Sequence, residues 1–199
     1  INDPTYEADP EAKAGKANQR AVALADLLWA DGHRICAIGG SDSHNTLEER
    51  YPGATEPSVP GDPATFVYME DLSAEHLLEG VRSCNCYVTR HCRIETGLLF
   101  GGQLPEDKEE LPYRICLRGQ KEKPEIFYLH NGKRVDCRVT GREDAWEAAG
   151  TVRLTEEAYQ WIRFGAEAKD GGFLFYGNAI TRGTGKQKLQ TFGEAVKQL

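Results

Sequence analysis

The stretch that decides the predicted fold spans residues 34–44 and reads RICAIGGSDSH. Its first part, Arg34 to Ile38, is a short apolar run that predicts a β-strand. Gly39 and Gly40 follow, and glycine lets the backbone turn tightly beside a ligand. Asp42 and His44 then come just past the end of the predicted strand. Because α/β folds place their sites at the carboxyl ends of strands, these two residues are the first candidates for chemistry.

The segments on both sides of this stretch alternate between helix and strand. Before it, a helix starts after the Asp-Pro-Glu signal at 9–11 and stops at Gly32, a residue that can take the left-handed conformation. After it, we expect a strand at 65–69, a helix capped by Ser73 and a strand at 86–89. The apolar side chains of the first helix recur at helical spacing: Ala17, Ala21, Leu24 and Leu28.

Such alternation predicts parallel β-α units in residues 1–94, as in an α/β layer or barrel. The pattern changes after residue 94, where short strands recur about every ten residues with tight turns between them. Asn131-Gly132 is one such turn, and residues 169–172 form another. We therefore expect a small antiparallel β-sandwich over 95–182 and a C-terminal helix or tail over 183–199.

Composition narrows the classes of function. The chain has 24 basic and 31 acidic residues, and residues 1–94 hold 8 and 15 of them. The acidic excess therefore lies in the first half, which argues against a broad nucleic-acid surface. Such an excess is typical of a solvated face, and its functional reading is a module that handles cations. No apolar run reaches the length of a membrane span. The chain opens at Ile1 and its only methionine is Met69, so we expect it to be part of a longer polypeptide.

The six cysteines point to a reducing compartment. Several of them lie in apolar, strand-like runs, where a free thiol behaves as a small hydrophobic group. Cys84, Cys86 and Cys92 lack the paired C-x-x-C spacing of a zinc knuckle. We therefore expect a cytoplasmic protein without structural disulfides.

Asp42 and His44 form the sharpest chemical pattern in the chain. A carboxylate and an imidazole two residues apart at a strand end project to the same side. Both are good ligands for zinc, manganese or iron. The same residues have a simpler reading, because the pair Ser41-Asp42 is also typical of a capped turn.

The surroundings of this pair resemble the last strands of the PHP (polymerase and histidinol phosphatase) family. The matching stretches follow in order at residues 27–44, 61–67, 72–82 and 87–90. The branch that the chain resembles most is the carbaryl-hydrolase-like metallohydrolases, in which a small β domain follows the barrel. Residues 161–180 are similar to the last hairpin of that domain.

The resemblance implies the C-terminal β/α units of a distorted barrel with a cluster of two or three divalent metals. Family members hydrolyse phosphoesters with a metal-activated water, and some cleave other esters or amides. Both residues of the family's Asp-x-His motif are metal ligands. Carried over, this makes Asp42 and His44 ligands, with Asp42 also orienting the attacking water. Arg90 and His91, after the last barrel strand, are the candidates for binding an anionic substrate.

The departures from the family pattern define the alternative. The chain has no His-x-His motif, and His91-Cys92 stands where the family commonly has Gly-Pro. Two ligands do not make a multinuclear site, so we expect the fragment alone to be inactive. Its expected partners are the missing N-terminal part of the barrel, a small phosphoester substrate and a second copy covering open strand edges. The alternative is a non-catalytic binding module.

Overall fold

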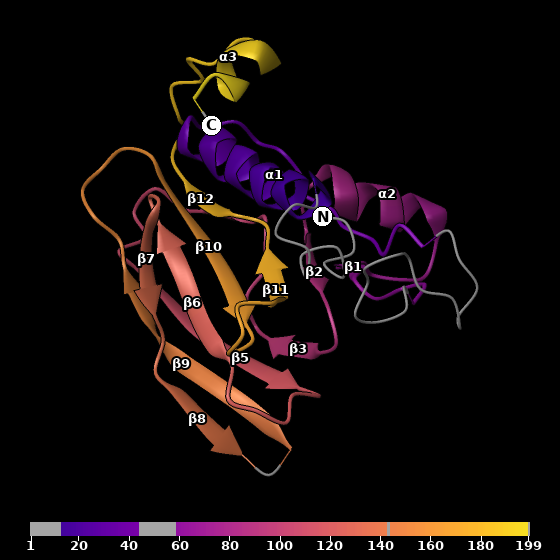
Figure 1. The fold of residues 1–199 in the computed structure, drawn as a ribbon. Helices are drawn as coiled ribbons and strands as arrows, with labels where there is room; N and C mark the ends of the chain where they lie inside the picture. The colour runs from indigo at the N-terminus through magenta and orange to yellow at the C-terminus, as the bar shows by residue number, and fades with distance from the viewer. Residues whose placement is uncertain (1–12, 44–58, 143, 199) are drawn as a thin grey trace.

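The computed structural model describes residues 13–43, 59–142 and 144–198, with the side chains of 13–20 and 192 left aside (Figure 1). Strands dominate these residues and form two sheets, one of eight strands and one of four. The larger sheet has the order β1-β2-β11-β10-β12-β4, with β6 also pairing β10 and β7 pairing β6. Its strands are β1 (Ala64–Val67), β2 (Cys86–Thr89), β4 (Gln103–Leu104), β6 (Glu125–His130), β7 (Lys133–Asp136), β10 (Gln160–Glu167), β11 (Phe173–Gly177) and β12 (Ile180–Arg182).

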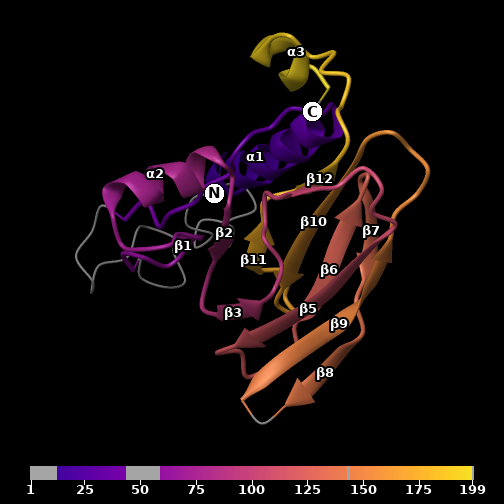
Figure 2. The same cartoon turned by 180° about the vertical axis from the view of Figure 1, so that it is seen from behind.

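The smaller sheet is antiparallel and has the order β3-β5-β9-β8. Apolar side chains of both sheets share one core, which includes Ile115, Val152 and Phe164. Figure 2 shows the small sheet from behind, on the side of the molecule away from the helices. Its strands are β3 (Arg93–Thr96), β5 (Glu110–Arg118), β8 (Val139–Arg142) and β9 (Ala145–Arg153).

Strand β10 joins this core to the helical side of the molecule. Its residues Ile162, Phe164 and Ala166 face the shared core. The alternate residue Trp161 packs with Ala25 and Trp29 of helix α1 (Lys13–Ala30). Because successive side chains of a strand point to opposite faces, one strand supplies both contacts.

The expected hairpins and the helix ends at Gly32 and Ser73 are confirmed, while the helix-start signal at 9–11 lies outside the described residues. β6 and β7 pair across Asn131-Gly132, and β10 pairs β11 across residues 168–172. Ser73 caps helix α2 (Ala74–Arg82) by accepting a hydrogen bond from the His76 amide. The C-terminal helix α3 (Phe192–Val196) begins in a capping box formed by Thr191 and Glu194. α1 ends before Gly32, whose φ is +89°.

The expectation of parallel β-α units is wrong for the described residues. β1 and β2 are antiparallel, with Val67 opposite Cys86, so α2 stands in the place of a hairpin loop. Its nine residues return the chain to the end of β1 that it left, and Gly80 packs closely on Val67. A parallel crossover instead has to return the chain along the whole length of the strand. The single parallel pairing among the described strands joins β12 to β4.

The predicted strand at 34–38 is also absent. These residues have no sheet partner, and Ile38 is 56% exposed. Side chains instead bond to the backbone of Ala37 in this run and of Gly39 just after it. No barrel is seen. The large sheet instead crosses the expected boundary at residue 94, because β2 pairs with β11.

Candidate functional site

Asp42 lies in an irregular segment, residues 33–43, that follows α1 (Figure 1). Its φ is +50°, a left-handed conformation in which aspartate is several times commoner than most residues. The residue is exposed and follows the double glycine by two positions. Its partner in the motif, His44, lies outside the described residues. Of the predicted metal-binding pair, the structure therefore places Asp42 alone.

Two side chains hold the segment in place. The buried Asn178 accepts a hydrogen bond from the Ala37 amide at 2.7 Å and donates one to the Ala37 carbonyl at 3.0 Å. Thr65, in β1, accepts from the Gly39 amide at 2.9 Å and donates to its carbonyl at 2.7 Å. These bonds replace a sheet ladder, so the segment is extended and anchored without being a strand.

Arg90 and His91 lie directly after β2. The Arg90 amide donates to the Leu174 carbonyl at 2.9 Å. The His91 amide donates to Asp62 Oδ1 at 2.8 Å, and the His91 ring forms an ion pair with the other carboxylate oxygen of Asp62. His91 also has a left-handed φ of +51°. Asp62 is not among the site residues predicted from the sequence.

The register of the sheet brings these groups to the same end. Ala64, at the start of β1, is opposite Thr89, at the end of β2. Thr65, the next residue, holds Gly39, and Asp62 precedes β1 by two residues. Two features therefore lie near the start of β1: the segment 33–43, which carries Asp42, and the Asp62–His91 pair.

The donor set suits a transition metal in type. Carboxylates and imidazoles bind zinc, manganese and iron, and a ligating histidine commonly gives its other ring N–H to a carboxylate. In the Asp62–His91 pair, the Nδ1 atom of the His91 ring is next to a carboxylate oxygen in the same way. In the part of the chain that the structure describes, however, no three His, Cys, Asp or Glu side chains are grouped so that they could hold a metal.

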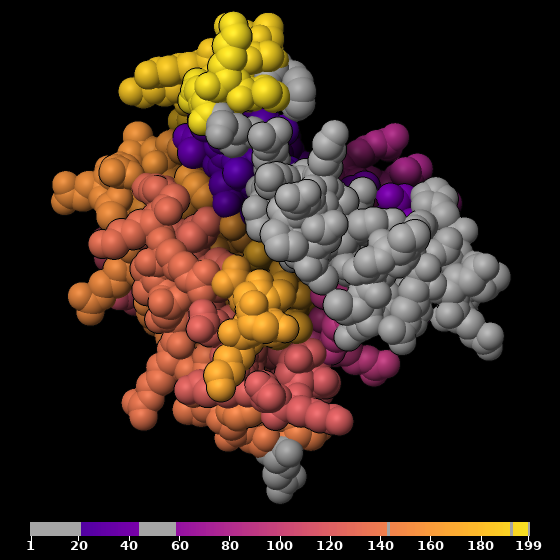
Figure 3. All heavy atoms as spheres, viewed as in Figure 1, coloured from indigo at the N-terminus to yellow at the C-terminus, as the bar shows by residue number. Residues whose placement is uncertain are grey.

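A separate feature is a cavity of about 300 Å³ between α1, residues 35–38 and the large sheet. Its wall is mostly apolar and includes Leu24, Leu28 and Val88. The charged Arg163 also lines it, 5% exposed and bonded to Asp26 at 2.6 and 2.8 Å. Figure 3 shows the indigo surface of α1 between the yellow C-terminal segment and the orange strands.

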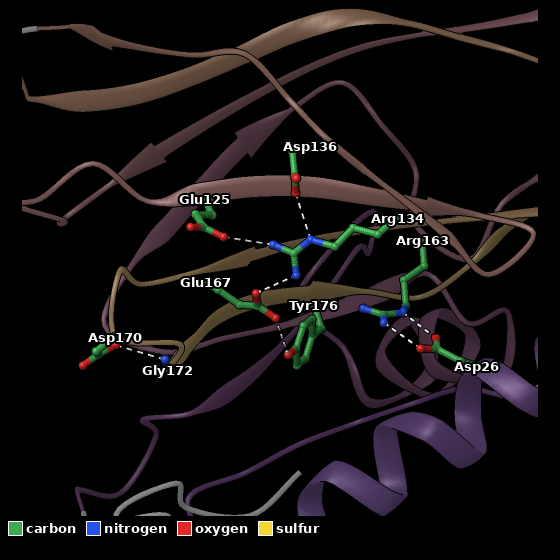
Figure 4. Close-up of polar contacts among 9 residues, drawn as sticks. All are labelled: Asp26, Glu125, Arg134, Asp136, Arg163, Glu167, Asp170, Gly172 and Tyr176. Carbon is green, nitrogen blue, oxygen red and sulfur yellow. Dashed lines mark hydrogen bonds and ion pairs between the residues drawn. The ribbon is translucent and has the colours of Figure 1, made fainter. Parts of the chain in front are cut away.

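The guanidinium of Arg163 is only partly satisfied. Its Nη1 atom is buried and has no hydrogen-bond partner among the described residues. In Figure 4 this nitrogen points away from Asp26, on the side of Tyr176, whose ring lies 5.0 Å from the guanidinium carbon. A buried donor without an acceptor costs about 1–3 kcal/mol, so it marks a place where a ligand acceptor would be favoured.

The other arginine in Figure 4, Arg134, has a different setting. It is exposed and bonded to three carboxylates, those of Glu125, Asp136 and Glu167. Exposed ion pairs of this kind contribute about 0–1 kcal/mol each. We read the group as a solvated network that stiffens the β6–β7 hairpin.

No described helix has the length and apolar character needed to cross a membrane. No family model and no curated protein matches this chain.

Proposed function

We propose that this chain is the C-terminal part of a metal-dependent hydrolase of the PHP type. Asp42 and His44 bind a divalent transition metal such as zinc, manganese or iron. The observation that carries the proposal is the Asp-x-His motif. Its Asp42 has a left-handed backbone conformation and belongs to the segment that Thr65 anchors at the start of β1. The gathering of Asp62, Arg90 and His91 at the same end of the sheet supports it.

Each residue has a role in this proposal. A bound metal supplies an activated water and neutralises negative charge that develops on the substrate. Asp42 and His44 hold the metal, and Asp42 also orients the water. Arg90 and His91 bind the anionic part of a small phosphoester, and Asp62 keeps the His91 ring in place. The remaining ligands come from a segment outside this chain, so the chain alone is inactive.

The test uses the longer polypeptide that includes the coding sequence upstream of Ile1, purified with manganese or zinc. We expect Asp42→Asn to lower hydrolysis of bis(p-nitrophenyl) phosphate by more than about 100-fold, since even outer-shell partners of metals are worth 10–100-fold. Metal content, measured by mass spectrometry, falls with it. The exposed Asp107→Asn is the matched control and leaves both unchanged. Wild-type activity and metal content in Asp42→Asn would overturn the proposal.

The second candidate is a non-catalytic module that binds a small ligand, favoured by the cavity beside Arg163. Asp26 already neutralises Arg163, so a second carboxylate would add an unbalanced buried charge. A neutral carbonyl can satisfy Nη1 without that cost. The ligand class is therefore an uncharged apolar molecule with one carbonyl acceptor.

Saturation-transfer NMR on the 199-residue chain tests this candidate, with acetophenone as the probe and toluene as its apolar match. We expect acetophenone to bind about tenfold more tightly, the worth of one hydrogen bond to a charged donor. Arg163→Lys keeps the charge beside Asp26 but removes the fork of the guanidinium, so it abolishes that preference. Exposed Arg153→Lys is the control. Equal binding of both probes to the wild-type chain rejects the candidate.

A further inference from the structure

Cysteines from two separate segments lie next to the cavity. Cys36 belongs to the anchored segment 33–43, Cys84 follows α2, and Cys86 begins β2. The sulfur atoms of Cys36 and Cys86 are 3.3 Å apart and share a hydrogen bond. Asn178 donates from its amide nitrogen to the Cys86 sulfur at 3.1 Å. The Cys86 sulfur thus contacts both the Cys36 sulfur and the Asn178 amide.

The two thiols differ in acidity. The hydrogen bond from Cys36 lowers the pKa of Cys86, with a further contribution from Asn178, and these outweigh the opposing effect of burial. Cys36 receives a lowering contribution from Cys84, but its bond to Cys86 and its own burial raise its pKa to about 11. Cys86 is therefore the more acidic of the two thiols. Two neighbouring thiols of which one ionises more readily are the arrangement from which a disulfide forms.

A small oxidant can reach this pair. Cys36 is partly exposed and lines the cavity, whereas Cys86 is fully buried behind it. The segment that carries Cys36 belongs to neither sheet, so it can move without breaking a strand pairing. The sulfur atoms must close from 3.3 Å to about 2.0 Å, the length of a disulfide bond.

We propose that Cys36 and Cys86 are a modification site, where a peroxide forms a reversible disulfide between the anchored segment and β2. The two thiols are oxidised and hydrogen peroxide is reduced. One S–S bond forms, the O–O bond breaks, and the two thiol protons leave in the two water molecules produced. A thiol reductant reverses the step. The bond fixes the segment that carries Asp42 covalently to the sheet, independently of whether the chain is a hydrolase.

The test exposes the folded 199-residue chain to a few equivalents of hydrogen peroxide, blocks the remaining thiols and digests it with trypsin without reduction. We expect peptides 35–50 and 83–90 joined, with a mass equal to their sum less two hydrogens plus one blocking group on the unpaired cysteine, and released by dithiothreitol. The oxidised chain also melts higher, by about 5–10 °C, since the bond closes a loop of about 50 residues.

Matched variants assign the bond within peptide 83–90, which contains both Cys84 and Cys86. Cys84→Ser keeps the cross-link, while Cys36→Ser and Cys86→Ser each lose it. Cys36→Ser is the safer variant because Cys36 is partly exposed, and its circular dichroism verifies the fold. A cross-link that survives in Cys36→Ser or Cys86→Ser overturns the assignment. So does a wild-type chain in which peroxide gives only sulfinic acids or no linked peptide.

Discussion

Asn178→Ala is expected to lower the free energy of unfolding by about 3 kcal/mol. The side chain is 2% exposed and bonds to both backbone groups of Ala37 and to the Cys86 carbonyl. Its removal leaves backbone groups that have lost their partners, and each one that stays buried costs about 1–3 kcal/mol. Urea denaturation followed by circular dichroism measures the loss.

Asn85→Ala is the matched control. Asn85 donates one side-chain hydrogen bond, at 3.3 Å, so its replacement costs about 1 kcal/mol or less. Trp29 reports on the segment itself, because its indole nitrogen donates to the Ile35 carbonyl at 3.2 Å. We expect the fluorescence of Trp29 to change in Asn178→Ala but not in Asn85→Ala. Equal stability of the two variants would show that Asn178 does not anchor the segment.

Asp26→Ala is the second large effect, a destabilisation of about 3–5 kcal/mol. It leaves Arg163 buried and positively charged, with its one carboxylate partner removed. The double variant Asp26→Leu with Arg163→Met regains most of the loss, because it replaces the ion pair by apolar side chains of similar size. Thermal and urea unfolding of the wild type, Asp26→Ala and the double variant measure the loss of stability and its recovery.

An exposed ion pair is the control for the stability effect of Asp26→Ala. Glu110 and Arg153 are 3.8 Å apart and 59% and 90% exposed. Glu110→Ala is expected to change stability by less than about 1 kcal/mol. If Asp26→Ala costs no more than Glu110→Ala, the Arg163–Asp26 pair does not stabilise the packing of α1 on the sheet.

Local chemistry explains which elements could be predicted. The Asn131-Gly132 turn fixes a hairpin through its own backbone preference, and Ser73 caps a helix within its own turn. The antiparallel pairing of β1 and β2 cannot be predicted from the sequence of either strand, because it depends on the end of β1 to which α2 returns the chain. Residues 34–38 have the composition of a strand, but the distant Asn178 side chain takes the place of a neighbouring strand by bonding to the Ala37 amide and carbonyl.

The candidate site divides in the same way. Asp42 stands out from the sequence because its motif is local. Asp62 reaches the site through the β1–β2 register, and a Pro- and Gly-rich loop gave no sign of that. Arg163 did leave a signal, a single charge inside the apolar run 161–166, which is typical of a buried pair. The meeting of Cys36 and Cys86, fifty residues apart, has no local signature.

The Ala37–Asn178 bonds also set a time scale. They join residues 141 apart in sequence. At a synthesis rate of about 5–20 residues per second, residue 37 leaves the ribosome about 7–28 s before Asn178 does. During that interval the segment 33–43 lacks its bonds to Asn178, whereas Thr65, only 26 residues after Gly39, is already made. Docking of the segment on Asn178 is therefore a late step in folding, because it waits for a contact between residues far apart in the sequence.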